Sequence, residues 1–266
     1  MNMSLDHALM EHATSPEMDL SGMPEAFQRA YGPTEPFEND FVELEMPDLV
    51  PLPYRGNRKI NPRSRGSTRI FSVWLDLQTR TPRNYGFDSQ VEYHNGAVTL
   101  IDPSVAQIQE QFGPIPFIDE DGKPANHYID LLITKKSGRK IAVAVKPTKR
   151  LKSGRFMRQL EALQKTMPSG IADELRLVTE ACIPRAEAFN AVMYQRFSLC
   201  RDIEVEIRLR DVLSSATGDI SICDLAERCR AGGRAFRPIV RGIFEGLLAK
   251  QSSGRINLFT KVRRLQ

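Results

Sequence analysis

Short runs of alternating or continuous apolar residues fill the middle of the chain and predict β-strands. The strands are expected at residues 70–77, 115–118, 128–134, 140–145, 175–179 and 203–209. The third and fourth runs are joined by Lys-Lys-Ser-Gly-Arg, a polar sequence typical of a turn, and together they predict a β-hairpin. Apolar residues at helical spacing predict helices that begin after Asp88 and that cover 156–167 and 186–199. This order of elements indicates a mixed α/β domain in which helices flank a sheet.

The last part of the chain has a different pattern, and we interpret residues 210–266 as a winged-helix domain. It contains three helical segments and then a β-prone run that ends in two arginines, with the ranges 211–216, 220–229, 236–250 and 256–262. Three arginines fall near one face of the third helix, opposite its apolar residues, and are candidates for DNA binding: Arg234, Arg237 and Arg241. Winged helices bind DNA or dock on proteins, and the sequence favours neither role.

The first 69 residues show no sustained periodicity. Residues 1–50 are interrupted by prolines and contain eleven acidic residues and one basic residue, so we expect a largely extended acidic arm. The arm acts either as a mask for a basic groove or as a solubilising tail. Residues 51–69 contain six basic residues and no acidic one, as expected of a flexible strap that lies along phosphates. The strap and the mixed α/β region together form the predicted domain at residues 51–209.

Composition and charge narrow the function classes. The chain has 266 residues, 41% of them hydrophobic, which is typical of a globular protein with a core and a smaller second domain. No stretch approaches the roughly 20 apolar residues that span a bilayer. The first residues lack the features of a secretion signal, so we expect a cytoplasmic protein with no membrane partner. The formal net charge is +4 in spite of the acidic arm, so the remaining chain is strongly basic and is either a nucleic-acid-binding surface or simply a solvated one.

The hairpin places candidate catalytic residues near one another. Asp130 lies on its first strand and Lys146 follows its second strand. A turn centred near Ser137 would put Asp130 opposite Ala144, and alternation would then place Ala144, Lys146 and Asp130 on one face. Glu92, on the preceding helix, would add a second carboxylate. Carboxylates bind Mg²⁺, which stabilises the charge of a scissile phosphate and lowers the pKa of a bound water, and a lysine can orient or help deprotonate that water.

Basic residues surround this candidate site. Residues 134–158 contain ten of them and no acidic residue, so phosphate groups would be attracted to the predicted metal. We expect Lys149, Arg150 and Arg155 to contact DNA. His94 and His127 also flank the site, although a single histidine of this kind is more often structural.

Four motifs of this region resemble the N-terminal nuclease domain of TnsA-like endonucleases, the DNA-cutting subunits of heteromeric transposases. They are FDSQVE at 87–92, DPSVAQIQEQFGPIPF at 102–117, HYIDLLI at 127–133 and AVAVKP at 142–147. The resemblance implies a restriction-endonuclease-like core, and the downstream helices, strand and winged helix extend it to most of the chain after residue 70. It assigns the family's catalytic residues to Glu92, Gln111, Asp130 and Lys146.

The function that this resemblance implies is a magnesium-dependent DNA endonuclease, with Mn²⁺ as a substitute, that cuts at the 5′ ends of a transposon. Its partners would be DNA, a transposase subunit that cuts and joins the 3′ ends, and a regulatory AAA+ ATPase. While acting on DNA, the protein would be associated with the nucleoid.

The sequence departs from the family pattern at three positions. Ala144 stands two residues before the lysine, where the family has Glu, Asp or Gln, so a side-chain metal ligand is missing. The backbone carbonyl of Val145 remains as a ligand beside the two acids, and the number of metals stays open. Ile129 and Phe112 replace prolines, which changes the backbone more than the chemistry.

Each site residue also has a structural interpretation. Glu92 and Asp130 can be surface acids that balance neighbouring bases, Lys146 the end of a strand, and Gln111 part of a turn. Two other functions therefore stay open. One is a catalytically degenerate DNA-binding or adaptor protein with a nuclease-like fold, and the other is a restriction or repair nuclease that acts without a transposase.

Overall fold

The computed structural model describes residues 50–60 and 68–265, which all lie within one compact unit, Glu43–Gln266. The predicted acidic arm at 1–50 lies outside the described residues apart from its last residue. The same holds for residues 61–67 in the predicted basic strap.

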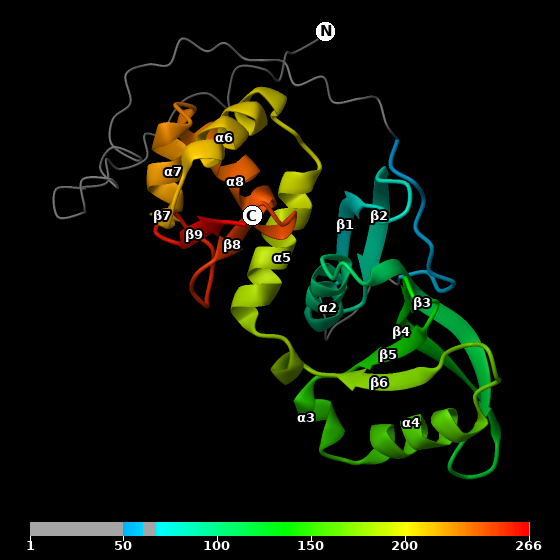
Figure 1. Cartoon of the computed structure of the whole chain (residues 1–266). Coiled ribbons are helices and arrows are strands. Elements are labelled where there is room, and N and C mark those ends of the chain that lie inside the picture. The colour runs from blue at the N-terminus through cyan, green and yellow to red at the C-terminus, as the bar shows by residue number, and fades with distance from the viewer. Residues whose placement is uncertain (1–49, 61–67, 266) are drawn as a thin grey trace, which may run out of the picture. The chain divides into compact units, whose positions relative to one another are not determined.

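A two-stranded and a four-stranded sheet form the middle of the described chain (Figure 1). The strands are β1 (Ile70–Leu75), β2 (Pro82–Phe87), β3 (Val105–Ile118), β4 (Pro124–Lys135), β5 (Lys140–Val145) and β6 (Glu174–Val178). The smaller sheet pairs β1 with β2 in antiparallel orientation. The larger sheet has the order β3-β4-β5-β6, in which only β5 and β6 are parallel. The predicted mixed sheet is therefore confirmed.

Helices cover both faces of the four-stranded sheet. They are α2 (Gln90–Leu100), the short α3 (Thr148–Leu151), α4 (Arg155–Thr166), the 3-10 turn η1 (Glu180–Cys182) and α5 (Arg185–Ser198). Tyr93 of α2 packs in one hydrophobic cluster with Leu131 and Val143, whereas Leu163 of α4 packs in another with Ala144. Because successive residues of a strand point to opposite faces, α2 and α4 lie on opposite sides of the sheet (Figure 1). This arrangement is consistent with a restriction-endonuclease-like core.

The hairpin of β4 and β5 has the predicted register. Leu131 pairs with Val143, which centres the turn on Ser137. Continuing the register by one residue places Asp130 opposite Ala144, where the paired part of the two strands ends. The hairpin therefore ends at the candidate site.

Other elements of this region differ from the sequence-based expectation. The strand expected at 115–118 is the end of the longer β3, whose first half is rich in glutamine and shows little apolar alternation. Strand β2 was not predicted, because the sequence PRNYGF has no regular pattern. Ser89, rather than Asp88, caps α2, because the Ser89 side chain accepts the N–H of Glu92.

The C-terminal part of the described chain has its own hydrophobic core. Its elements are α6 (Ile203–Ser215), β7 (Asp219–Ser221), α7 (Ile222–Arg228), the 3-10 turn η2 (Gly232–Ala235), α8 (Phe236–Phe244), β8 (Leu248–Lys250) and β9 (Lys261–Arg264). The three strands form an antiparallel sheet in the order β7-β9-β8. Leu209, Leu225 and Ile239 join the helices in one cluster. No helix of the described residues is long and apolar enough to cross a membrane.

The predicted strand at 203–209 is wrong, because these residues begin helix α6. Val205 and Leu209 are buried four residues apart, whereas Ile207, two residues from each, is 53% exposed. The alternating apolar residues suggested a strand, but the buried ones are four residues apart, which is the spacing of a helix. Asp202 stabilises the start of the helix by accepting the N–H of Val205 at 3.2 Å. The domain boundary expected after Leu209 falls inside this helix.

The helix expected at 236–250 is shorter than its apolar pattern. It ends at Phe244, and Leu248 already belongs to β8. Gly246 lies between them with a φ of 80°, a conformation that favours glycine and stops a helix. Within the expected run at 256–262, only its last two residues belong to β9.

Candidate active site

Glu92 lies in the first turn of α2 and its carboxylate folds back on the start of the helix. Its Oε1 accepts the Ser89 hydroxyl at 2.9 Å, and its Oε2 accepts the N–H of Asp88 at 3.0 Å. The Ser89 hydroxyl in turn accepts the N–H of Glu92 at 3.2 Å. Glu92 is only 6% exposed. This cap fixes a buried carboxylate at the end of α2 that faces the large sheet.

Gln111 joins Glu92 to Asp130. Its Nε2 donates to Glu92 Oε2 at 3.1 Å and to Asp130 Oδ1 at 3.4 Å. Gln111 is completely buried in β3 and has a φ of 46°, which is uncommon for a residue other than glycine. The strand departs from regular alternation here, since Ile108 packs with α2 whereas Phe112, four residues later, packs on the α4 side. The backbone irregularity thus turns the amide toward the two carboxylates.

Asp130 lies in β4 where the hairpin opens. Its Oδ2 accepts the backbone N–H of Val145 at 2.6 Å, so the side chain takes the place of a ladder partner at the end of β5. The contact involves the amide of Val145, and the role expected for the Val145 carbonyl stays a prediction. Ala144 is fully buried and packs with Leu163 of α4. The side chain at position 144 therefore faces α4, and it carries no carboxylate.

The two carboxylates influence each other's protonation. Burial, together with the charge of Asp130, raises the pKa of Glu92 to about 7. Burial also raises the pKa of Asp130, against the opposing effects of the Val145 N–H and the charges of Lys146 and Arg58. Two acids in such a site do not ionise independently, because each charge disfavours the other. The pair therefore holds a proton near neutral pH unless a cation replaces it.

Arg58, which the sequence analysis did not single out, belongs to the same network. It donates hydrogen bonds to Gln111 Oε1 and to Asp88, and its guanidinium lies 5.4 Å from the centre of the Tyr128 ring. Since a guanidinium can only donate, it fixes the Gln111 oxygen toward itself and the Gln111 nitrogen toward the carboxylates. Arg58 therefore determines which way this amide faces.

The described part of the basic strap reaches the site by following the sheets. Leu52 exchanges backbone hydrogen bonds with Pro82 and Asn84 of β2, at 2.8 and 2.9 Å. Five residues later, the N–H of Asn57 donates to the carbonyl of Gln111 at 3.2 Å. The sequence showed that this segment is basic, but it did not indicate which of its basic residues contacts the rest of the protein. The segment has no periodic pattern that would distinguish buried from exposed positions.

The family comparison extends this geometry. Residues 102–177 match the family described as TnsA-like endonuclease N terminal. This segment, the TnsA-like domain, is similar to the N-terminal part of TnsA-like endonucleases. The resemblance expected from the motifs is thereby confirmed, and the match covers less than a third of the chain. It includes Gln111, Asp130 and Lys146, whereas Glu92 precedes it. No curated protein matches the chain.

Lys146 follows β5 in the TnsA-like domain and its side chain lies on the α4 side. Its Nζ is 4.8 Å from the centre of the Phe156 ring. Its charge lowers the pKa of Asp130, although the two side chains form no ion pair in the described structure. Lys146 is thus within electrostatic reach of the carboxylates and is held by an aromatic ring rather than by an acid.

The two histidines that flank the motifs have different surroundings. His127 packs edge to face against Phe117, with the ring of Phe156 6.3 Å away. Burial, followed by the charges of Lys146 and Arg58, lowers its pKa to about 4. His127 is therefore neutral near pH 7. His94 lines a separate cleft on the other side of α2.

A further buried acid adjoins the site in the TnsA-like domain. Glu110 is completely buried, and its Oε1 accepts the N–H of Gly86 at 3.2 Å. Its Oε2 has no hydrogen-bond partner among the described residues. Burial raises its pKa to about 7. The sequence gave no reason to separate this acid from the polar residues around it.

The residues expected to bind DNA lie in different environments. Lys149, Arg150 and Arg155 are exposed on α3 and α4 of the TnsA-like domain. Arg237 is also exposed, whereas Arg234 forms ion pairs with two acids of α6 and its cap.

The expected exposure of Arg241 is wrong. It is 2% exposed, donates to the carbonyls of Phe197 and Cys200 at 3.0 Å, and pairs with Glu206. These contacts link α8 to α5 and α6. Arg241 is therefore a structural residue in the interior, because a buried guanidinium needs several acceptors.

The donor set of the site fits a hard cation that brings its own water or phosphate ligands. No group of three His, Cys, Asp or Glu residues that could hold a metal occurs among the described residues. Glu92 and Asp130 supply two carboxylates, and both accept a hydrogen bond from Gln111. Mg²⁺ is commonly held by one or two carboxylates together with waters and substrate phosphates. Gln111 Nε2 occupies the position between the acids and would have to move for an ion to bind both.

Proposed function

We propose that this protein is the magnesium-dependent endonuclease subunit of a TnsA-type transposase and hydrolyses phosphodiester bonds at the 5′ ends of a transposon. The TnsA-like domain supports a nuclease of the transposase class. The observation that carries the proposal is the contact of one buried amide, that of Gln111, with the carboxylates of both Glu92 and Asp130. Two buried acids with raised pKa values are expected where a cation is to be bound.

Each residue of the site has a proposed task. Glu92 and Asp130 would hold the ion, with the carbonyl of Val145 as a further ligand, and Gln111 would turn away from the acids. Magnesium, or manganese in its place, would stabilise charge on the scissile phosphate and lower the pKa of bound water. Lys146 would orient the attacking water, since its charge already acts on Asp130.

We further propose that the C-terminal elements form a winged helix. The order α6-β7-α7-α8-β8-β9, with the strands arranged as β7-β9-β8, supports this interpretation. Arg237 is the exposed base of α8, the proposed recognition helix. The domain would contact DNA or a partner of the transposition machinery.

The partners proposed from the family are DNA, a transposase subunit that acts on the 3′ ends, and a regulatory AAA+ ATPase. The protein would act in the cytoplasm at the nucleoid. Lys149, Arg150 and Arg155, which are exposed beside the end of β5, would contact DNA phosphates there.

Metal binding tests this function without depending on a partner protein. Calorimetric titration with Mn²⁺ should show binding to the full chain, and Asp130→Asn and Glu92→Gln should weaken it at least about tenfold, because each removes a charged ligand. Glu161→Gln is the matched control, since Glu161 is an exposed acid on α4. Equal Mn²⁺ affinity in all four proteins would contradict the proposed site.

Ala144 supports a second candidate function, that of a degenerate DNA-binding or adaptor protein. It is fully buried and cannot supply the ligand that the family has at this position. Such a protein would bind DNA with a steep salt dependence, without a metal, and with no response to Lys146→Ala. A restriction or repair nuclease would share the proposed chemistry, and its gene would lack a neighbouring transposase and ATPase.

A further inference from the structure

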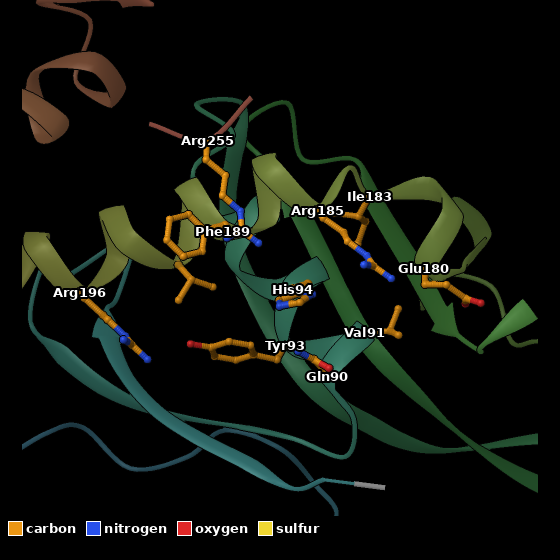
Figure 2. A pocket seen from close by; sticks show the side chains of 11 residues that line it. Gln90, Val91, Tyr93, His94, Glu180, Ile183, Arg185, Phe189, Arg196 and Arg255 are labelled. Atoms are coloured by element: carbon orange, nitrogen blue, oxygen red, sulfur yellow. The ribbon is translucent and has the colours of Figure 1, made fainter. Parts of the chain in front are cut away.

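A basic cleft lies on the other side of α2 from Glu92. It has a volume of about 670 Å³ and is lined by α2, α5 and the loop between β8 and β9. Figure 2 shows Arg196 near one end of this cleft and Glu180 near the other, with Phe189, Arg255 and Arg185 between them. His94 also lines it and is neutral at pH 7, because burial lowers its pKa.

No acidic side chain of the described residues forms an ion pair with the arginines of this cleft. Arg185, Arg196 and Arg255 are exposed and form no ion pair with any residue that the structure describes. The acid that lines the cleft is Glu180, and its carboxylate accepts the N–H of Thr148 at 2.9 and 3.2 Å. Three guanidinium groups therefore line the cleft without a carboxylate partner in the part of the chain that the structure describes, which suits an anionic ligand from outside.

The position of Arg255 is set by a buried side chain. Asn190 of α5 is 4% exposed, donates to the carbonyl of Gly254 at 3.0 Å, and accepts the N–H of Ile256 at 2.9 Å. These bonds clamp the backbone on both sides of Arg255. The guanidinium then lies 4.5 Å from the centre of the Phe189 ring. Both the nitrogen and the oxygen of the buried Asn190 amide are hydrogen-bonded to the loop. These bonds hold the loop on α5 and keep Arg255 at the cleft.

The spacing of the arginines fits a linear series of phosphates. Arg185 and Arg196 are the first and the third-last residue of α5, and because an α-helix rises about 1.5 Å per residue they are about 16 Å apart along it. One strand of duplex DNA places a phosphate about every 3.4 Å along its axis. The cleft therefore spans several consecutive phosphates, and Phe189, 43% exposed, gives it an aromatic wall.

We propose that this cleft binds the phosphate backbone of one DNA strand and so guides the substrate past α2 toward the carboxylates of Glu92 and Asp130. This inference rests on the proposed function only for the identity of the polymer as DNA. Arginine forks match phosphate geometry, and a row of them along one helix favours a regular polyanion over an acidic peptide, whose carboxylates have no fixed spacing.

Fluorescence anisotropy with a labelled DNA duplex, in the absence of divalent cations, tests the cleft. The variant Arg185→Gln/Arg196→Gln/Arg255→Gln should bind at least about tenfold more weakly and should lose up to about three units of the slope of log K against log salt, roughly 0.9 per phosphate contact. The control Arg80→Gln/Lys123→Gln/Lys165→Gln removes the same charge from exposed positions elsewhere and should have a smaller effect. Equal losses in both variants, or none in the first, would overturn the proposal.

The clamp gives a second test that separates positioning from general folding. Asn190→Ala should weaken DNA binding in the wild-type background and should add little in the Arg255→Gln background, because both changes remove the same contact. Thermal melting of each variant reports the structural cost separately. Additive losses of DNA affinity would contradict a role of Asn190 through Arg255. A glutamate-rich peptide that competes with DNA at equal charge concentration would show a peptide site instead.

The outcome is independent of the proposed catalytic function. Asp130→Asn should retain DNA affinity, since Asp130 does not line the cleft. If Mn²⁺ binding is insensitive to Asp130 while the cleft variant loses DNA, the nuclease proposal fails and the cleft stands. If the cleft variant keeps its DNA affinity while Asp130→Asn loses Mn²⁺ binding, the cleft proposal fails and the nuclease proposal stands.

Discussion

The two sides of α2 present opposite kinds of electrostatics. On one side, Glu92 is buried and its carboxylate is engaged by Ser89, Asp88 and Gln111. On the other side, the arginines of the basic cleft are exposed and have no acidic partner among the described residues. Buried acids shift their pKa and exchange a proton for a cation, whereas exposed arginines stay charged at every accessible pH. One helix thus separates a site suited to chemistry from a surface suited to binding.

The largest expected effect is a loss of DNA cleavage when the carboxylate site is changed, while DNA binding is retained. Asp130→Asn keeps an acceptor for the Val145 N–H but removes the charge that would hold the ion, so DNA cleavage with Mg²⁺ should fall by about 10³-fold or more. Gel assays of nicking, with the proposed transposase present, measure this loss. Binding to DNA should change little. Cleavage by Asp130→Asn at the wild-type rate would place the reaction elsewhere.

A smaller loss is expected at Lys146. Lys146→Ala should reduce cleavage by about 10²-fold, because a positioned side chain that assists proton transfer or water orientation contributes roughly 10² to 10⁴. Lys146→Arg keeps the charge and the stacking on Phe156 and should restore part of the rate. Lys165→Ala, a change at an exposed lysine of α4 that has no proposed role in DNA binding, serves as control for charge. Cleavage at the wild-type rate by Lys146→Ala would show that Lys146 takes no part in the reaction.

Stability should depend on pH through the buried acid Glu110. Its pKa rises from the usual 4.5 to about 7 in the folded state, so the folded protein holds the proton more tightly than the unfolded chain. The associated stability is complete below pH 4.5 and is lost as the pH rises through 7, up to about 3 kcal/mol. Denaturant titration should find a flatter profile between pH 4.5 and 7 in Glu110→Gln. An unchanged profile would mean that Glu110 is ionised in the fold.

The smallest effect concerns Arg58. Its charge lowers the pKa of Asp130, so Arg58→Gln should let the carboxylate pair keep its proton to higher pH. The midpoint of Mn²⁺ binding against pH should move upward. Lys59→Gln, an exposed change beside it, should leave the midpoint in place. A downward movement would show that Arg58 mainly repels the ion.

The sequence predicted those parts of the fold whose pattern has a single structural meaning. A polar turn between two β-prone runs fixed the hairpin centre at Ser137, and with it the position of Asp130 opposite Ala144. At 203–209, alternation of apolar and charged residues fitted a strand, yet the helix start at Asp202 and burial at a spacing of four decided for a helix. Local periodicity could not distinguish these cases.

The candidate site was predictable in its acids and not in the groups that orient them. Glu92 and Asp130 follow from motifs, but the turned backbone of Gln111 and the arrival of Arg58 depend on tertiary contacts. The burial of Arg241 shows the same limit, because a helical arginine points to solvent or to the interior depending on acceptors from other helices. Residue type alone reports neither outcome.

The central claim is that Glu92 and Asp130 form one cation site. Anomalous diffraction from crystals of the full chain soaked with Mn²⁺ tests it directly. The account predicts one peak within coordination distance of both carboxylates, with the Gln111 amide turned away from them. A peak that contacts neither acid, or soaked crystals in which Gln111 still bridges the two carboxylates and no ion is bound, would contradict it.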